Sequence, residues 1–184
     1  MLWGLPAPPS APIDKTLTHS AQPMTQKKLN VAQSERTPLA QLTEAAIHPV
    51  LGYQLAQAGI VATQVFEERV GRAGGLHRVE FTILALVQGN PDVTARQLAR
   101  VLAVTPANVA IWLDRLESRA LVVRRRSESD ARVQHIRISK AGSALVDRSV
   151  AQVLEGEQAA LAVLSAAERA LLIELLHKVA LARR

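Results

Sequence analysis

The chain of 184 residues contains no cysteine. That absence excludes disulfide bonds, thiolate catalysis, thiol-based redox sensing and zinc sites with cysteine ligands. Aromatic residues make up only 3% of the sequence, and no apolar run reaches the ~20 residues of a membrane-spanning helix. The first residues lack a charged start followed by an apolar stretch, so we expect no secretory signal, no membrane association and a cytoplasmic location.

Apolar residues nevertheless account for 48% of the chain, and most of them are Ala, Leu and Val. Because Ala and Leu favour helix, the composition predicts a mainly α fold. The net charge of +6 favours a polyanionic partner, either nucleic acid or an anionic surface. A charge of this size also serves solubility alone, so its position along the chain must decide between these readings.

Composition and periodicity divide the chain into four regions. Residues 1–44 hold six of the nine prolines and keep no helical or strand period, which predicts a disordered tail. Residues 45–75 carry an apolar stripe at helical spacing and predict a first dimerisation helix. Residues 76–140 predict a compact unit of short helices with a small β-hairpin. Residues 141–184 predict two further dimerisation helices with apolar faces.

Local signals within residues 94–140 set the order of the elements. Thr94 and Gln97 have the spacing of a capping box, which opens one short helix. Thr105 followed by Pro106 then opens a second helix, with a hydroxyl at the N-cap and proline at the first helical position. Two short strands follow, around a polar, basic tip. This order is typical of a winged helix-turn-helix, a unit that reads duplex DNA.

The second of these helices is the predicted recognition helix. Its apolar stripe faces inward, and small and polar side chains lie on the opposite face. The predicted DNA contacts of this helix are Thr105, Ala107, Asn108, Ile111 and Arg115. Asn108 can bond adenine with its amide, or be a solvated surface residue. Thr105 suits a phosphate at the helix N-terminus, and Ile111 suits thymine methyls or supports a neighbouring side chain.

Positive charge is concentrated in and beside the hairpin. Eight basic and four acidic residues fall between positions 114 and 140, which accounts for most of the net charge of the chain. The predicted phosphate contacts are Arg124, Arg125 and Arg126. One of these three arginines could instead have a structural role. We expect Arg132 to enter the minor groove, and Asp130 to orient its guanidinium or to close the turn.

Taken together, these segments resemble the MarR family of bacterial transcription regulators over residues 49–180. The resemblance rests on VTPANVAIWLDRLESRALV, on RRRSESDARVQHIRISKAG and on the Asp130-x-Arg132 pattern in the hairpin. Ala120 departs from it, since family members usually have glycine there. The resemblance implies a homodimeric repressor of a pseudo-palindromic operator, and three long helices with apolar stripes outside the DNA-reading unit agree with a dimer.

The resemblance also implies a small effector, such as an aromatic acid or a phenol, bound between the dimer helices and the DNA-reading lobe. Family members often carry an arginine on the first helix, where this chain has Ala56 and Gln57. Tyr53, His77 and Trp112 are the candidate ligand-binding residues, although each also fits a core or boundary position. The histidines are scattered without ligand spacing, so we expect no metal and no cofactor.

Two other classes of function were compared with the DNA-binding regulator. An enzyme is disfavoured, because the sequence has no glycine-rich phosphate loop, no paired carboxylates and no nucleophile motif. A winged helix can also be a protein-interaction module without specific DNA binding. The basic residues of the hairpin favour the DNA-binding reading over that alternative.

Overall fold

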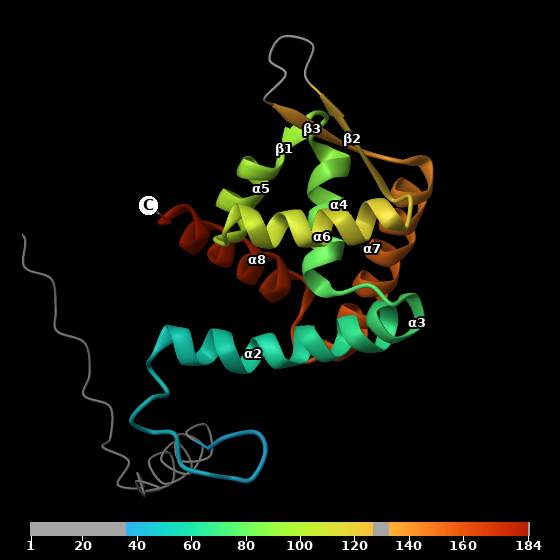
Figure 1. Cartoon of the computed structure of the whole chain (residues 1–184). Helices are drawn as coiled ribbons and strands as arrows, with labels where there is room; N and C mark the ends of the chain where they lie inside the picture. The colour runs from blue at the N-terminus through green and yellow to red at the C-terminus, as the bar shows by residue number, and fades with distance from the viewer. Residues whose placement is uncertain (1–35, 127–132, 184) are drawn as a thin grey trace, which may run out of the picture. The chain divides into compact units, whose positions relative to one another are not determined.

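The protein is described from a computed structural model, which covers residues 36–126 and 133–183 (Figure 1). Asp130, Arg132 and most of the predicted tail lie outside these residues. The contacts of the chain define two compact units, Met1–Gln54 and Leu55–Arg184, with the boundary inside the first long helix. Each unit is described by itself.

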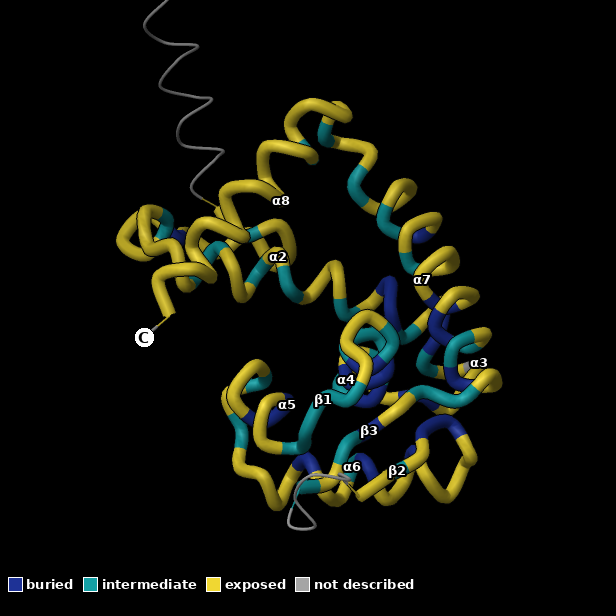
Figure 2. Tube along the Cα trace, turned by 90° about the horizontal axis from the view of Figure 1, so that it is seen from above, coloured by how far each residue is buried: buried dark blue, intermediate teal, exposed yellow. Residues whose placement is uncertain are grey.

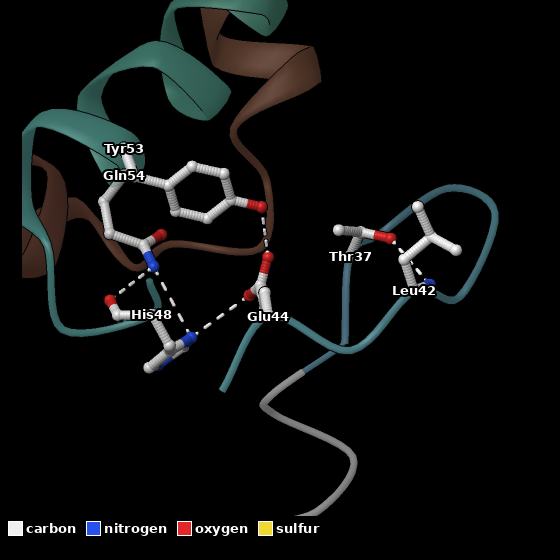
Figure 3. Close-up of polar contacts among 6 residues, drawn as sticks. All are labelled: Thr37, Leu42, Glu44, His48, Tyr53 and Gln54. Carbon is white, nitrogen blue, oxygen red and sulfur yellow. Dashed lines mark hydrogen bonds and ion pairs between the residues drawn. The ribbon is translucent and has the colours of Figure 1, made fainter. Parts of the chain in front are cut away.

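The described part of the first unit is a series of turns ahead of the first helix. An isolated bridge joins Arg36 to Thr43. The carboxylate of Glu44, which is only 7% exposed, accepts a hydrogen bond from the Tyr53 hydroxyl and lies 3.1 Å from Nδ1 of His48 (Figure 3). This carboxylate raises the pKa of Tyr53, because a phenol that donates to an anion holds its proton more tightly.

A long helical segment carries the chain into the second unit. It consists of α2 (Leu51–Phe66), a π-helical turn η1 (Glu67–Gly71) and α3 (Arg72–Gly74). The helix begins at Leu51, later than the predicted start of this region at residue 45. Gly75 ends it in the left-handed conformation, with φ at 55°. Val65, Phe66 and Val70 are its buried side chains.

The unit that the sequence predicts to read DNA begins after this helix. Its first elements are α4 (Arg78–Gly89), β1 (Val93–Thr94), α5 (Ala95–Leu102) and α6 (Pro106–Ser118). The capping box is confirmed, since Gln97 Oε1 accepts from the Thr94 amide at 2.8 Å and Thr94 Oγ1 accepts from the Gln97 amide at 3.3 Å. Thr105 Oγ1 likewise accepts from the Asn108 amide at 3.3 Å and caps α6. Local sequence therefore fixes where both helices begin.

The remaining elements complete a small sheet and two long helices. They are β2 (Val122–Arg126), β3 (Gln134–Ile138), α7 (Lys140–Ala160) and α8 (Ala166–Leu181). The sheet is antiparallel in the order β1-β3-β2, with Val93 opposite Ile136 and Val122 opposite Ile138. The predicted mainly α fold with a β-hairpin wing is confirmed, and β1 is an additional strand that the sequence did not reveal.

The core of the second unit lies where α4, α5, α6 and the sheet meet. Ile83, Leu84, Val109 and Leu116 have no measurable exposure, and Ile136 of β3 is 1% exposed. Burial of each such side chain contributes about 2 kcal/mol. In Figure 2 buried stretches of the tube gather around α4, whereas nearly all of α8 is exposed.

The start of α7 lies directly against the end of the recognition helix. An added Cβ at Gly142 would meet the backbone oxygen of Leu121 at 2.1 Å and Cγ1 of Ile138 at 2.9 Å. Ser139 fixes the same approach, since its amide donates to Leu121 O at 3.0 Å and its hydroxyl to Ala120 O at 2.7 Å. Position 142 therefore has no room for a side chain.

Both helices of the helix-turn-helix end in a left-handed alanine. Ala103 after α5 and Ala120 after α6 each have φ at 54°. At the end of α6 the Leu121 amide donates to Leu116 O at 2.9 Å, and the Ala120 amide bonds back to the last turn at 2.8 Å. This is a Schellman motif, in which glycine is the usual residue at the left-handed position. The turn between α5 and α6 repeats the same bonds.

Candidate nucleic-acid interface

The side chains predicted to contact DNA from α6 share one exposed face. Thr105, Ala107, Asn108, Ile111 and Arg115 are all exposed. Ile111 is 52% exposed, although it is a large apolar side chain on a face of otherwise small or polar groups. The inward face carries the buried residues Val109, Leu113 and Leu116, as the helical period predicted. The helix thus presents its N-terminal turn and a face of small and polar groups to the solvent.

Arg124 joins the wing to this helix. Its guanidinium pairs with Asp114 through Nη2 and lies 3.5 Å from Oε2 of Glu117 through Nε. Its backbone amide also donates to Glu117 Oε1 at 3.3 Å. Two carboxylates of α6 therefore hold β2, while Arg125 and Arg126 are exposed. Arg124 is therefore the arginine of the three in the wing whose contacts fit a structural role.

A second ionic contact anchors the other side of the sheet. Arg137 of β3 donates to Asp92 Oδ1 at 2.5 Å and to Oδ2 at 2.9 Å, and His135 Nδ1 lies 2.6 Å from the Asp92 carbonyl oxygen. The hydrogen bond from Arg137 lowers the pKa of the Asp92 carboxyl. The sequence did not indicate Asp92 as the partner of these two side chains.

Arg119, the residue that ends α6, is exposed but has partners within the fold. Its guanidinium donates to the carbonyl oxygens of Gly75 and Gly74 at 3.0 and 3.1 Å, and it lies 4.0 Å from Oε2 of Glu80. Glu80 is 2% exposed and also accepts from the His77 amide at 3.0 Å. These contacts join the end of α6 to the start of α4. Arg119, one of the eight basic residues between positions 114 and 140, therefore has a structural role.

The three candidate ligand-binding residues do not share a described pocket. Tyr53 belongs to the first unit, where Glu44 engages its hydroxyl. His77 is the exposed N-cap of α4, and Trp112 is half-buried against the core. A cleft of about 850 Å³ in the second unit is lined by none of them. Their ligand role therefore stays a prediction.

Two capped helices joined by a tight turn, followed by an antiparallel hairpin, define a winged helix-turn-helix protein. A family model described as the MarR family matches residues 74–133, which run from the end of α3 to the start of β3. The chain is 27% identical over 140 residues to a protein of Thauera aromatica assigned to transcriptional regulation of the hcr operon, covering 76% of this chain and 84% of the relative.

Two solved structures extend the similarity. The transcriptional repressor CouR, bound to a 23-mer DNA duplex, is 28% identical, with a TM-score of 0.69 over 77% of this chain and 99% of CouR. The MarR family protein RV2887 of Mycobacterium tuberculosis, in complex with p-aminosalicylic acid, is 28% identical, with a TM-score of 0.59 over 71% of this chain and 98% of that one. The chain is therefore similar to the MarR family of transcription regulators, and the family model matches it over residues 74–133. Within the residues described, no helix is both long and apolar enough to cross a membrane.

Proposed function

We propose that the protein is a homodimeric repressor that binds a pseudo-palindromic operator with α6 and the β2–β3 hairpin. The observation that carries this proposal is the fixed placement of the wing against the recognition helix. Arg124 connects β2 to Asp114 and Glu117 of α6, and the exposed face of α6 is left available. A helix and a wing held in one orientation can engage the major groove and the neighbouring backbone together.

The proposed contacts divide by the part of the DNA that they meet. Asn108 bonds an adenine through its amide, and Ile111 meets thymine methyl groups. Thr105 binds a phosphate at the N-terminus of α6. Arg125 and Arg126 contact phosphates from the wing. The remaining proposed contacts are Ala107, which allows close approach, Arg115, Arg132 in the minor groove, and Asp130, which orients Arg132.

A second copy of the chain explains the exposed apolar helices. Every residue of α8 except Arg169 is exposed or nearly so in the single chain, including Leu171 at 54% and Leu175 at 47%. Leu55 and Ile60 of α2 are also exposed, at 39% and 51%. Soluble proteins rarely leave apolar surface of this extent uncovered. In a two-fold dimer the recognition helices would meet half-sites about 10 bp apart.

The proposed effector is a small aromatic acid that releases the repressor from its operator. The complex of the relative RV2887 with p-aminosalicylic acid supports this class of ligand. The candidate residues Tyr53, His77 and Trp112 remain part of the proposal, because their polar-tipped or aromatic side chains suit such a ligand.

Footprinting tests the proposal with the full chain and the intergenic DNA upstream of its own gene, at two salt concentrations. We expect a protected palindrome whose occupancy falls steeply with salt. Replacing Arg125 or Arg126 by Ala should lower the slope of log affinity against log salt by about 2, because the dimer loses one phosphate contact in each half-site, with base preference unchanged. Asn108→Ala should change base preference, and Lys178→Ala on α8 should change neither quantity.

The opposite outcome is equally clear. Binding that ignores sequence, or an absence of protection on every promoter fragment tested, would contradict the operator. It would favour a protein-interaction module built on the same winged helix. A uniform loss of affinity in Asn108→Ala, without a change in base preference, would make that side chain a backbone contact.

A further inference from the structure

The side chain of Arg183 joins the end of α8 to the helix-turn-helix. Its Nη1 donates to Val101 O at 2.9 Å, and its Nη2 donates to Arg100 O at 3.4 Å. Both acceptors belong to the last turn of α5. The backbone of Arg183 is held as well, because its amide donates to Ala180 O in α8 at 3.2 Å. Two helix ends that lie 82 positions apart in the sequence are thus joined through a guanidinium.

The last turn of α5 suits a cation at this place. Its carbonyl groups form the negative end of the helix dipole, so a guanidinium is stabilised there. The Ala103 amide donates to Arg100 O at 3.4 Å, and Val101 O takes its hydrogen bond from Arg183. Ala103 stands two residues before Thr105, the N-cap of α6. Arg183 therefore acts on a turn that is directly continuous with the recognition helix.

Other hydrogen bonds hold the DNA-reading unit, α4 through β3, from its opposite side. Gln88 Nε2 of α4 donates to Ser143 Oγ and to Asp147 Oδ1 of α7, each at 2.9 Å. Arg119 donates to Gly75 O, just after α3, at 3.0 Å. Figure 1 and Figure 2 both show α5 and the C-terminal end on one side of α4, and α3 and α7 on the other. Arg183 thus adds support on the side away from α3 and α7.

We propose that Arg183 is a positioning residue that fixes the orientation of the DNA-reading unit on the dimer helices, and so sets the half-site spacing that the protein accepts. The inference rests on the proposed function, in which a second copy holds α8 and two units read one operator. One base pair added between the half-sites moves one of them by about 3.4 Å and turns it by about 34° around the duplex. A unit supported on both sides follows this change only by breaking the Arg183 bonds.

Operator duplexes of altered spacing test the proposal with the full chain. The probes are the palindrome protected in the footprint and two versions with one base pair inserted or removed at its centre. The measured quantity is the ratio of affinities for the native and the altered spacing. Arg183→Ala removes the contact and Arg183→Lys keeps the charge. Arg100→Ala removes a cation from the same turn but keeps its carbonyl group, and Lys178→Ala removes a cation of α8 that pairs with Glu174.

The ratio should fall by about tenfold in Arg183→Ala. The wild-type protein has to break an Arg183 contact to bind an altered duplex, and a hydrogen bond from a charged donor contributes about a factor of ten to such an equilibrium. Arg183→Lys should give an intermediate ratio, because an ammonium group lacks the fork that reaches two carbonyl groups. Arg100→Ala and Lys178→Ala should keep the wild-type ratio.

A spin label measures the same orientation without DNA. Because the chain has no cysteine, Ser118→Cys at the exposed end of α6 places one label on each protomer. Pulsed electron paramagnetic resonance then gives the distribution of distances between the two labels of the dimer. We expect a narrow distribution in the labelled parent, a broader one when Arg183→Ala is added, and an unchanged one when Lys178→Ala is added.

Two results would overturn the proposal. An equal loss of affinity for all three duplexes, with the ratio unchanged, would give Arg183 a role in stability alone. A label distribution that Arg183→Ala leaves unchanged would show that the contact does not hold the DNA-reading unit. Failure of the wild-type chain to protect any palindrome would instead contradict the operator function, while the label distribution would still test the contact, so the two failures are distinguishable.

Discussion

Replacing the two left-handed alanines by glycine should stabilise the helix-turn-helix. Ala103 and Ala120 both have φ at 54°, and both are exposed, so a methyl group removed there loses little packing. The left-handed conformation costs an alanine roughly 1–2 kcal/mol relative to glycine. Glycine gives back part of that gain through the larger entropy of its unfolded state, roughly 0.4–1 kcal/mol.

The expected net gain is about 0.5–1 kcal/mol for each substitution. The two sites lie at opposite ends of α6, about 20 Å apart for its 13 residues, so their effects should add. For a chain of this size the double variant should melt roughly 4 °C higher. Differential scanning calorimetry at one fixed protein concentration measures the change, since dimerisation would otherwise shift the midpoint.

Ala151→Gly is the matched control, because Ala151 is an exposed residue in the middle of α7. There the same change should cost about 1 kcal/mol by lowering helix propensity. The opposite signs at 151 and at 103 and 120 separate the conformational effect from a general effect of glycine. If Ala103→Gly and Ala120→Gly lowered the melting temperature as Ala151→Gly does, the left-handed assignment of both turns would be wrong.

Three further predictions concern the contacts that hold the DNA-reading unit together. The pKa of Asp92 is lowered by Arg137, so its stabilisation is present above the ordinary pKa of the carboxyl, about 4, and is lost as the pH falls through the lowered value. Asp92→Asn should therefore flatten the decline of the melting temperature between about pH 5 and pH 2, and an unchanged decline would refute the assignment. Arg119→Ala should cost about 1–2 kcal/mol in urea unfolding, because the buried carboxylate of Glu80 loses its cation, and Arg119→Lys should recover part of the loss. Thr94→Ala should cost about 1 kcal/mol by removing the cap of α5, whereas Thr94→Ser should be nearly neutral, and equal losses in both would argue against the hydroxyl.

The sequence predicted the features that depend on neighbours along the chain. The caps at Thr94 and Thr105 each need a hydroxyl and an amide three residues later, so the local pattern is sufficient. The inward stripe of α6 follows from helical periodicity in the same way. The left-handed conformation of Ala120 was not predicted; its φ of 54° is one that glycine adopts at the least cost.

The features that the sequence did not reveal depend on partners far along the chain. Arg124 and Arg126 look alike in sequence, and only the packing of β2 on α6 brings Arg124 to Asp114. Arg137 meets Asp92, 45 positions earlier. The strand β1 has two residues and exists because β3 passes beside it, so no periodicity could indicate it. Folding decides which arginines of a basic segment remain exposed.

Because Gly142 has no side chain, the first turn of α7 packs directly on backbone and can tilt only about that contact. The first turn of the helix touches backbone at Leu121, where no flexible side chain can absorb a displacement. With 21 residues the helix is about 30 Å long, so a tilt of about one degree at the Gly142 contact moves its far end by about 0.5 Å. Conversely, a shift of about 1 Å at the far end of α7 rotates its first turn by about two degrees. A larger residue at 142 would separate the first turn of α7 from the Leu121 backbone. A tilt of α7 would then no longer be transmitted directly to the end of the recognition helix.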